Sequence, residues 1–468
     1  MLYALLRATS HVALRWFYRE VIVEGRERVP AEGPLLVVAN HPNQLVDAML
    51  VGIGLPRDVT FTGKAVLLDH PALAVLMRRL PFVPLRRAQD ERKKLAQDAN
   101  ARIDPSHNAD AFRAIHDALA AGRAVLIFPE GISHHRPELA PLKTGTARIA
   151  LAARDDRGIR GLSILPVGLD FEDKARARTR VLVRIGAPIA LDDWRPAPGG
   201  AAPAEQLTQQ TDAALRELTL NFPSEEDRRR VLGAARLLSA VFAGPGPLPA
   251  ADAPHGLAHD MARRAERVRR RAAEAPEALR ARLDGFLVRL DALSAELARR
   301  DLPPEDVALE TGAAPGARFA LREGARLLLA APLALWGRLN HWIPLRLALA
   351  TARRTSRTPE DPAMHTIVAG LVMVLAFYVV AGALVWRLAG PWWALLYVAT
   401  LPASATWDFR FRDYLERGAR RVRAYFTLRR DPALRARLTS EVAWLRGEAA
   451  SLERAGGDRG PGTGDLGR

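Results

Sequence analysis

Residues 35–54 read LLVVANHPNQLVDAMLVGIG and decide how the first half of the chain folds. The five apolar residues Leu35–Ala39 have the length and composition of a strand that is buried on both faces. A polar turn follows, and then a helical pattern that we expect over Pro42–Gly54, because proline suits the first turn of a helix. A strand, a turn and a helix in succession predict an α/β unit, with His41 and Asp47 near the start of the helix.

The same alternation continues to about residue 190. Short apolar runs predict further strands at Val59–Thr62, Phe82–Leu85, Ala124–Phe128, Ile164–Leu169 and Val181–Ile185. Helical patterns lie between them, at Ala65–Arg79, Asp90–Ala101, Ala109–Ala121 and Lys143–Ala153. We therefore expect a mixed sheet flanked by helices over residues 21–225, followed by a helical insertion over 226–315.

The amino-acid composition excludes several kinds of site and partner. The chain of 468 residues contains no cysteine, which excludes disulfides, zinc-thiolate sites and cysteine nucleophiles. Lys and Arg number 68 against 52 Asp and Glu, a net charge of +16 that attracts anionic lipids, phosphorylated substrates or nucleic acid. The chain has no zinc-finger spacing and no basic patch interleaved with aromatic residues, so we expect no nucleic-acid partner. We also expect no metal site, because the adjacent His134 and His135 point apart.

An uncharged stretch near residue 370 points to a membrane. Thr366–Trp386 carries no charge over 21 positions, about the length that crosses the hydrocarbon core as a helix. A second apolar run, Trp392–Trp407, follows a Gly-Pro break, so we expect a transmembrane hairpin over 366–407. Arginines flank both outer ends, which predicts that both ends face the cytoplasm.

Other segments are expected to lie along the membrane or outside it. Residues 1–20 predict an amphipathic surface helix, because apolar residues alternate with arginines at helical spacing. Prolines and polar residues interrupt 322–350, which predicts interfacial helices there and a membrane module over 318–410. We expect a basic helical tail at 411–455 and a disordered end at 456–468.

Two strand ends carry groups suited to catalysis. The neutral imidazole of His41 can take a proton from a hydroxyl, and Asp47 would fix its tautomer. In the second segment, AVLIFPEGISHHRPELAPLKTG at 124–145, the Glu130-Gly131 pair lets backbone amides approach a ligand, and Arg136 and Lys143 can hold a phosphate. The alternatives are a helix cap with an acid at the positive end of the helix, and an ordinary surface loop.

Together, four blocks in order resemble the glycerophospholipid acyltransferase (lysophosphatidic acid acyltransferase-like) family over about residues 20–190. The blocks are Asn40-His41 with Asp47, Phe82-Val83-Pro84-Leu85-Arg86-Arg87, Phe128-Pro129-Glu130-Gly131, and Leu165-Pro166-Val167-Gly168. The resemblance implies that His41 is the general base and Asp47 its orienting partner. It also implies a substrate site that includes Asn40, Arg86 or Arg87 as a phosphate ligand, Glu130, Gly131, Arg136 and Lys143.

The chain departs from the common family pattern twice. Five residues separate His41 from Asp47 where four are usual, and Ile132-Ser133 stands where Thr-Arg usually follows the Phe-Pro-Glu-Gly block. The wording around both sites is similar to the yeast-type branch of glycerol-3-phosphate and dihydroxyacetone-phosphate acyltransferases, which shares the longer spacer. We hypothesise that Arg136 replaces the missing arginine.

By this resemblance the chain transfers an acyl group from acyl-CoA or acyl-carrier protein to a glycerol phosphate or lysophospholipid hydroxyl in phospholipid biosynthesis. No cofactor is implied beyond the acyl donor, and membrane lipids are the expected partners. We expect a bacterial inner membrane, with the catalytic domain facing the cytoplasm. A non-catalytic lipid-binding scaffold and a phospholipid hydrolase or transacylase using the same site are the alternatives.

Overall fold

The computed structural model divides into two compact units, Met1–Asn221 with Arg346–Met373, and Phe222–Leu345 with Val374–Arg468. It describes residues 2–65, 68, 71–85, 106–243, 260, 262, 276–307, 309, 311–358 and 361–455. The predicted helix at 90–101 and the predicted disordered end lie outside these residues.

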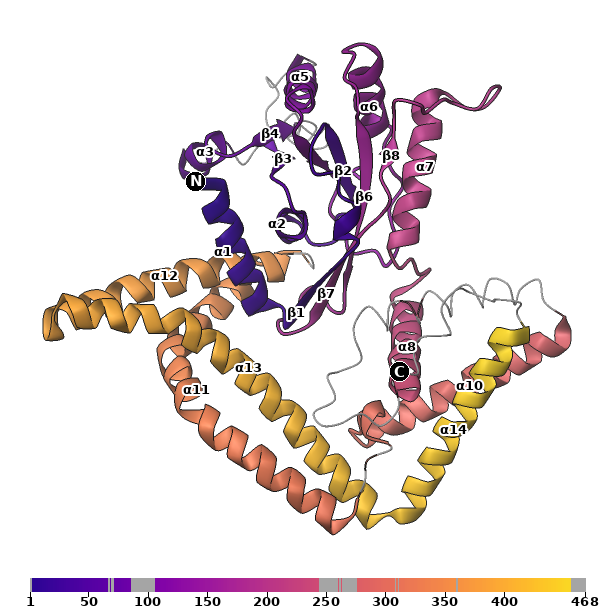
Figure 1. The fold of residues 1–468 in the computed structure, drawn as a ribbon, viewed down its shortest axis with the longest axis vertical. Coiled ribbons are helices and arrows are strands. Elements are labelled where there is room, and N and C mark those ends of the chain that lie inside the picture. Colours follow the sequence, from indigo (N-terminus) through magenta and orange to yellow (C-terminus); the bar gives the residue numbers. More distant parts are fainter. Residues whose placement is uncertain are drawn as a thin grey trace. The chain divides into compact units, whose positions relative to one another are not determined.

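A mixed sheet forms the centre of the first unit (Figure 1). Its strands are β1 (Glu20–Glu24), β2 (Leu35–Ala39), β3 (Val59–Lys64), β4 (Phe82–Leu85), β5 (Ala124–Ile127), β6 (Ser163–Phe171), β7 (Arg180–Ile185) and β8 (Ile189–Ala190). The order is β1-β7-β6-β2-β5-β3-β4, with β8 paired to β6. β6 runs antiparallel to β7 and β8, and the other pairs are parallel. The predicted fold class is therefore confirmed.

The central strand β2 explains why its sequence is apolar throughout. All five of its residues are buried, because side chains alternate between two cores on opposite faces of the sheet. Leu35 and Val37 pack in one core with residues of α1 (Leu2–Phe17) and α2 (Leu45–Gly54). Leu36 and Val38 pack in the other with residues of α5 (Ser106–Ala120), α6 (Gly145–Asp155) and α7 (Pro203–Leu218). The unit is thus a sheet between two helical layers.

Local sequence patterns predicted most of these strands and helices. All six predicted strands are present, and β1 and β8 are additional. The helix at 65–79 is shorter than expected, α3 (Pro71–Arg78), and η1 (Arg26–Arg28) is a short 3-10 helix. Near the predicted site, α2 begins at Leu45 and not at Pro42. Gln44 has a φ of 50°, which no residue of a right-handed helix adopts, and so residues 41–44 form a turn.

The second unit is helical. It holds α8 (Glu225–Ala243), α10 (Glu277–Arg299), η3 (Pro304–Asp306) and α14 (Pro432–Ala455). Buried residues of α8, α10 and α14 form a core with Ala424 and Leu428 of α13 (Pro391–Arg430). Parts of α11 (Ala313–Thr355) and α12 (Asp361–Ala389) also belong to it, and each of these helices continues into the first unit.

α11 is one continuous helix rather than the interfacial pair expected at 322–350, although it contains Pro332 and Pro344. Its polar residues face neighbouring helices. His341 Nε2 lies 2.7 Å from the Tyr378 hydroxyl, and Arg338 Nε lies 3.2 Å from Asp408. Hydrogen bonds and an ion pair inside the helix cluster satisfy groups that would be expensive to expose to lipid.

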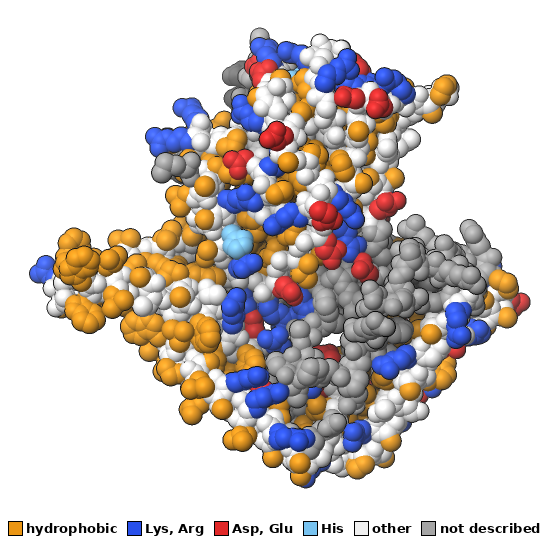
Figure 2. Space-filling view, viewed as in Figure 1, with side chains coloured by type: hydrophobic (Ala, Val, Ile, Leu, Met, Phe, Trp, Pro, Cys, Tyr) orange, Lys and Arg blue, Asp and Glu red, His pale blue; other side chains and the backbone are white. Residues whose placement is uncertain are grey.

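Among the described helices, α12 alone is long and apolar enough to cross a bilayer. The second apolar run at 392–407 is the first part of α13, which continues as one helix to Arg430. Figure 2 shows hydrophobic side chains crowded over α12 and the adjoining part of α13. They include Val379, Val380 and Trp392, whose exposed fractions are 72%, 68% and 79%.

Candidate active site

A buried His-Asp pair lies just beyond the carboxyl end of β2. His41 Nδ1 lies 2.9 Å from Asp47 Oδ2, and the two side chains are 9% and 0% exposed. A carboxylate only accepts hydrogen bonds, so this contact places the proton of a neutral imidazole on Nδ1 and leaves Nε2 as the basic nitrogen. This is the arrangement that a general base requires.

The longer spacer between the two residues does not separate them. The turn at 41–44 takes up the additional residue, and Asp47 stands in the first turn of α2. The Asn43 backbone N–H donates to the same Asp47 oxygen over 2.6 Å. The turn therefore folds back onto the carboxylate and aligns it with the imidazole.

Burial governs the electrostatics of the pair. It raises the pKa of the Asp47 carboxyl, and hydrogen bonds from His41 and from the Asn43 backbone oppose this rise. Asp47 Oδ1 is buried and has no hydrogen-bond partner among the described residues. The neighbouring Tyr18 hydroxyl, also buried, accepts from Asn43 Nδ2 over 3.0 Å. Asp47 is thus enclosed by protein, and its carboxylate faces the candidate site through its contact with His41.

Glu130, at the end of β5, joins the second predicted loop to the first. It is 2% exposed and accepts hydrogen bonds from the backbone N–H of His41, over 2.7 Å, and of Ala140, over 2.9 Å. It also contacts His134 Nε2. The Phe128 ring stacks on the His41 ring, with centroids 3.8 Å apart and an angle of 12° between the planes. The hydrogen bond to Glu130 fixes the His41 backbone, and the Phe128 ring covers one face of the imidazole.

Two cationic side chains lie at the exposed edge of this loop. Gly131 has a φ of 71°, and a Cβ there would lie 2.5 Å from Lys143 Nζ, so the lysine packs over the glycine. Lys143 and Arg136 are both exposed, and the Arg136 backbone N–H donates to His134 Nδ1 over 3.2 Å. Both cations are accessible to an anion in solvent.

The remaining predicted residues fall into two groups. The Asn40 side chain donates to the Leu169 carbonyl over 3.0 Å and accepts from the Leu169 N–H over 2.7 Å, so its visible contacts tie β2 to β6. Arg86 and Arg87 lie outside the described residues. A substrate contact for these three residues stays a prediction.

The structure adds residues that motif spacing did not single out. The Lys174 carbonyl accepts from Tyr18 and Asn43, and Lys174 Nζ donates to the His134 carbonyl over 3.2 Å. Ser133 Oγ accepts from the Gln44 backbone N–H over 3.2 Å. No local pattern marks Tyr18 or Lys174, because their partners lie 25 to 156 positions away in the chain.

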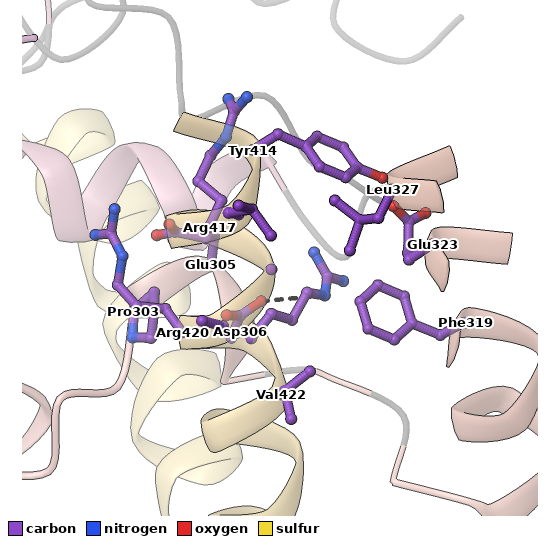
Figure 3. Close-up of a pocket in the computed structure, with 14 residues that line it drawn as sticks. Pro303, Glu305, Asp306, Phe319, Glu323, Leu327, Tyr414, Arg417, Arg420 and Val422 are labelled. Carbon is purple, nitrogen blue, oxygen red and sulfur yellow. Dashed lines mark ion pairs between the residues drawn. The ribbon is translucent and has the colours of Figure 1, made fainter. Parts of the chain in front are cut away.

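A separate cavity of about 280 Å³ lies within the second unit (Figure 3). Residues of η3, α11 and α13 line it, among them Asp306, Phe319, Glu323, Tyr414 and Arg421. The Asp306 Oδ1 atom lies 3.5 Å from Arg421 Nε, and Figure 3 marks an ion pair of Asp306 with a dashed line. None of the residues predicted for catalysis lines this cavity.

Known proteins are similar to part of the first unit. Residues 20–170 match the family model described as Acyltransferase. An uncharacterized acyltransferase of Schizosaccharomyces pombe is 25% identical over 254 residues, with 38% of each chain covered. Glycerol-3-phosphate O-acyltransferase 2 of Saccharomyces cerevisiae is 33% identical over 146 residues, which cover 31% of this chain and 20% of the yeast protein. The chain thus covers between a fifth and two fifths of the length of these relatives.

A crystal structure of the 1-acyl-sn-glycerophosphate acyltransferase of Thermotoga maritima is 20% identical, with a TM-score of 0.34, and the match covers 46% of this chain and 77% of that chain.

Strands β1 to β5 and the His-Asp pair at a strand end lie within the residues that match the Acyltransferase family model. The chain is similar to acyltransferases, one of them named a glycerol-3-phosphate O-acyltransferase.

Proposed function

We propose that the chain transfers a fatty acyl group from a thioester to the hydroxyl of a phosphorylated glycerol or lysophospholipid. The observation that carries this proposal is the buried contact between His41 and Asp47. His41 Nε2 takes the proton of the acceptor hydroxyl as its oxygen attacks the thioester carbonyl carbon. The C–S bond then breaks, an ester forms, and the proton passes to the departing thiolate.

The environment of His41 suits this direction of proton transfer. The imidazolium that forms lies 2.9 Å from the Asp47 carboxylate, which stabilises it. General-base help of this kind contributes about 10²- to 10⁴-fold. The rest of the acceleration depends on how the two substrates are positioned.

Glycerol 3-phosphate is the acceptor that we favour. The similar yeast protein is named a glycerol-3-phosphate O-acyltransferase, and this chain offers the exposed cations Arg136 and Lys143 beside the base. Arg86 or Arg87 would complete the phosphate site. Lysophosphatidic acid is the second candidate, because it presents the same phosphate with an acyl chain attached. Acyl-CoA or acyl-carrier protein would supply the thioester.

We place the enzyme on a membrane. α12 has the length and composition of a spanning helix, and α1 presents exposed apolar residues, such as Leu5, beside arginines. Arg353, Arg354 and Arg357 precede α12, so the positive-inside rule puts the catalytic unit on the cytoplasmic side. A bacterial cytoplasmic membrane is the setting that we propose.

The first test is acyl transfer by the purified protein in detergent, from radiolabelled palmitoyl-CoA to glycerol 3-phosphate and, separately, to lysophosphatidic acid. His41→Ala should lose transfer while the protein stays folded, and His11→Ala, on the exposed side of α1, should keep it. Free fatty acid released without an acceptor would indicate a hydrolase. Wild-type protein that transfers to neither acceptor, from acyl-CoA or acyl-carrier protein, would favour the scaffold alternative.

Arg136 provides a separate test of the phosphate site. Arg136→Ala should raise the KM for the phosphorylated acceptor about tenfold and leave the KM for the thioester unchanged, because one charge-assisted contact is lost. Arg157→Ala removes an exposed arginine outside the site and serves as the matched control. Equal acceptor KM values in the two variants would refute a role for Arg136.

A further inference from the structure

The turn that carries His41 contains a strained residue. Gln44 has φ 50° and ψ −125°, a backbone conformation suited to glycine, and it is one of three non-glycine residues with positive φ in the described part of the chain. It stands three residues after His41 and three before Asp47. Such a conformation persists only where surrounding contacts hold it.

One of those contacts reaches the first residue of α12. Gln44 Nε2 donates to Asp361 Oδ1 over 2.9 Å, across 317 positions of sequence. The other carboxylate oxygen of Asp361 accepts from the backbone N–H groups of Arg357 and Thr358, each over 2.8 Å. Asp361 is 9% exposed, so one buried carboxylate joins the His41 turn to the turn that starts α12.

The start of α12 is also part of the core of the catalytic unit. Ala363 and Ile367 are 0% and 6% exposed and lie in the same hydrophobic core as Val46 and Leu50 of α2. His365 Nδ1 lies 3.0 Å from Thr355 Oγ1 at the end of α11. The first two turns of α12 therefore belong to the hydrophobic core that also contains residues of α2, the helix that holds Asp47.

This attachment sets the distance between the site and the membrane. The uncharged stretch begins at Thr366, five residues after Asp361, which is about 8 Å along a helix. The headgroup layer on each side of the hydrocarbon core is about 5–8 Å thick. If the uncharged stretch lies in the hydrocarbon core, Gln44 and the adjacent His41 turn lie at the level of the lipid headgroups.

We infer that Gln44 and Asp361 form a latch by which the first turn of α12 positions the His41 turn at the headgroup layer. Gln44 is a positioning residue that acts through the turn between His41 and Asp47. This inference rests on the proposed acyl transfer, because it explains how the base would meet an acceptor held at the membrane surface. The latch itself is a contact that can be tested without turnover.

A reversal of the hydrogen bond provides the test. Gln44→Glu sets a carboxylate against the Asp361 carboxylate and breaks the contact. Adding Asp361→Asn restores it with donor and acceptor exchanged, because the new amide at 361 donates to position 44 while its oxygen still accepts from Arg357 and Thr358. Gln209→Glu, exposed on α7, is the matched control for the added charge.

Two readouts are taken from full-length protein in vesicles of phosphatidylethanolamine and phosphatidylglycerol. Amide hydrogen exchange of residues 40–47 should speed up about tenfold or more in Gln44→Glu and return to the wild-type rate in the double variant. The kcat for acyl transfer should fall about ten- to a hundredfold and recover likewise, with the thermal transition of the protein unchanged.

The outcomes separate the latch from the reaction. Exchange at 40–47 that does not change in Gln44→Glu overturns the latch. Faster exchange with an unchanged kcat overturns the positioning role of Gln44. Recovery in the double variant supports positioning, because a general loss of stability would not be repaired by a second substitution. An inactive wild type with the expected exchange pattern would refute the proposed reaction and leave the latch supported.

Discussion

His41 shows how much one side chain depends on its surroundings. The imidazole contacts Asp47 through Nδ1, its backbone N–H donates to Glu130, and its ring stacks on Phe128. Each contact restricts a different movement, so Nε2 has one direction in which to accept a proton. In the proposed reaction, the Asp47 carboxylate would stabilise the imidazolium that forms.

Replacing Asp47 by Asn tests whether turnover depends on the negative charge of this side chain or only on its size. Asp47→Asn keeps the size of the side chain, and its oxygen can still accept from Asn43, but the imidazolium loses its counter-charge. We expect kcat to fall about 10²- to 10⁴-fold. Burial raises the pKa of Asp47, so the charged form is disfavoured in the folded state and the free energy of unfolding at pH 7 should not decrease. Urea unfolding beside the transfer assay measures both, and a variant with wild-type kcat would contradict the role of the charge.

At the scale of elements, close backbone approach explains a residue in the last family block. A Cβ at Gly168, in β6, would lie 2.7 Å from both Cβ and the carbonyl oxygen of Leu218, at the end of α7. Glycine is therefore required for this helix to pack on this strand.

Gly168→Ala should destabilise the first unit by about 1–3 kcal/mol, because the backbone of α7 must move away from the sheet. Gly145→Ala is the matched control, since a Cβ there meets no atom within 4 Å. The midpoint of urea unfolding, measured for each variant, compares their stabilities. Equal midpoints would show that the close approach is absent.

A buried acid in η3 predicts how the second unit responds to pH. Burial raises the pKa of Asp306 to about 6, although the nearby Arg421 opposes this rise. The folded state then binds the proton more tightly than the unfolded state, so the free energy of unfolding should decrease as pH rises from about 4 to about 6.

Asp306→Asn should remove this decrease, which we expect to be about 1–3 kcal/mol, and Asp284→Asn, exposed on α10, should not. Hydrogen exchange of residues 300–307 between pH 4 and 7, corrected for its intrinsic pH dependence, measures the effect. A slope that persists in Asp306→Asn would assign it to another group.

At the scale of the whole molecule, α12 connects two functions. Its first turns complete the core of the acyltransferase unit, and its middle exposes apolar side chains over a length that spans a bilayer. If α12 spans a bilayer, as we propose, membrane attachment and the position of the candidate site would depend on one helix.

Charging the exposed middle of α12 should release the protein from membranes. Val379→Asp with Val380→Asp adds two carboxylates at positions that are 72% and 68% exposed, each costing about 2.5–3.5 kcal/mol at the centre of a bilayer. Val288→Asp, at a position of α10 that is also 68% exposed, is the control. Sedimentation with vesicles after alkaline extraction separates bound from free protein, and a double variant that still sediments would show that α12 does not anchor the chain.

The sequence alone determined what depends on neighbouring residues. Apolar runs predicted β2, β5 and the uncharged part of α12, because burial on both faces of a sheet or in lipid requires a continuous apolar pattern. The order of the motif blocks predicted the family and named His41 and Asp47. Only the tertiary structure decided that α2 begins at Leu45.

Packing between distant segments decided the rest. Glu130 meets the His41 backbone across 89 positions, and Gln44 meets Asp361 across 317. Two polar residues of α11, a segment whose polar residues argued against a lipid-crossing helix, pair with Tyr378 and Asp408 on other helices. A local pattern records whether a residue prefers burial. It does not record which distant group will satisfy that residue, since the partner is set by how the whole chain packs.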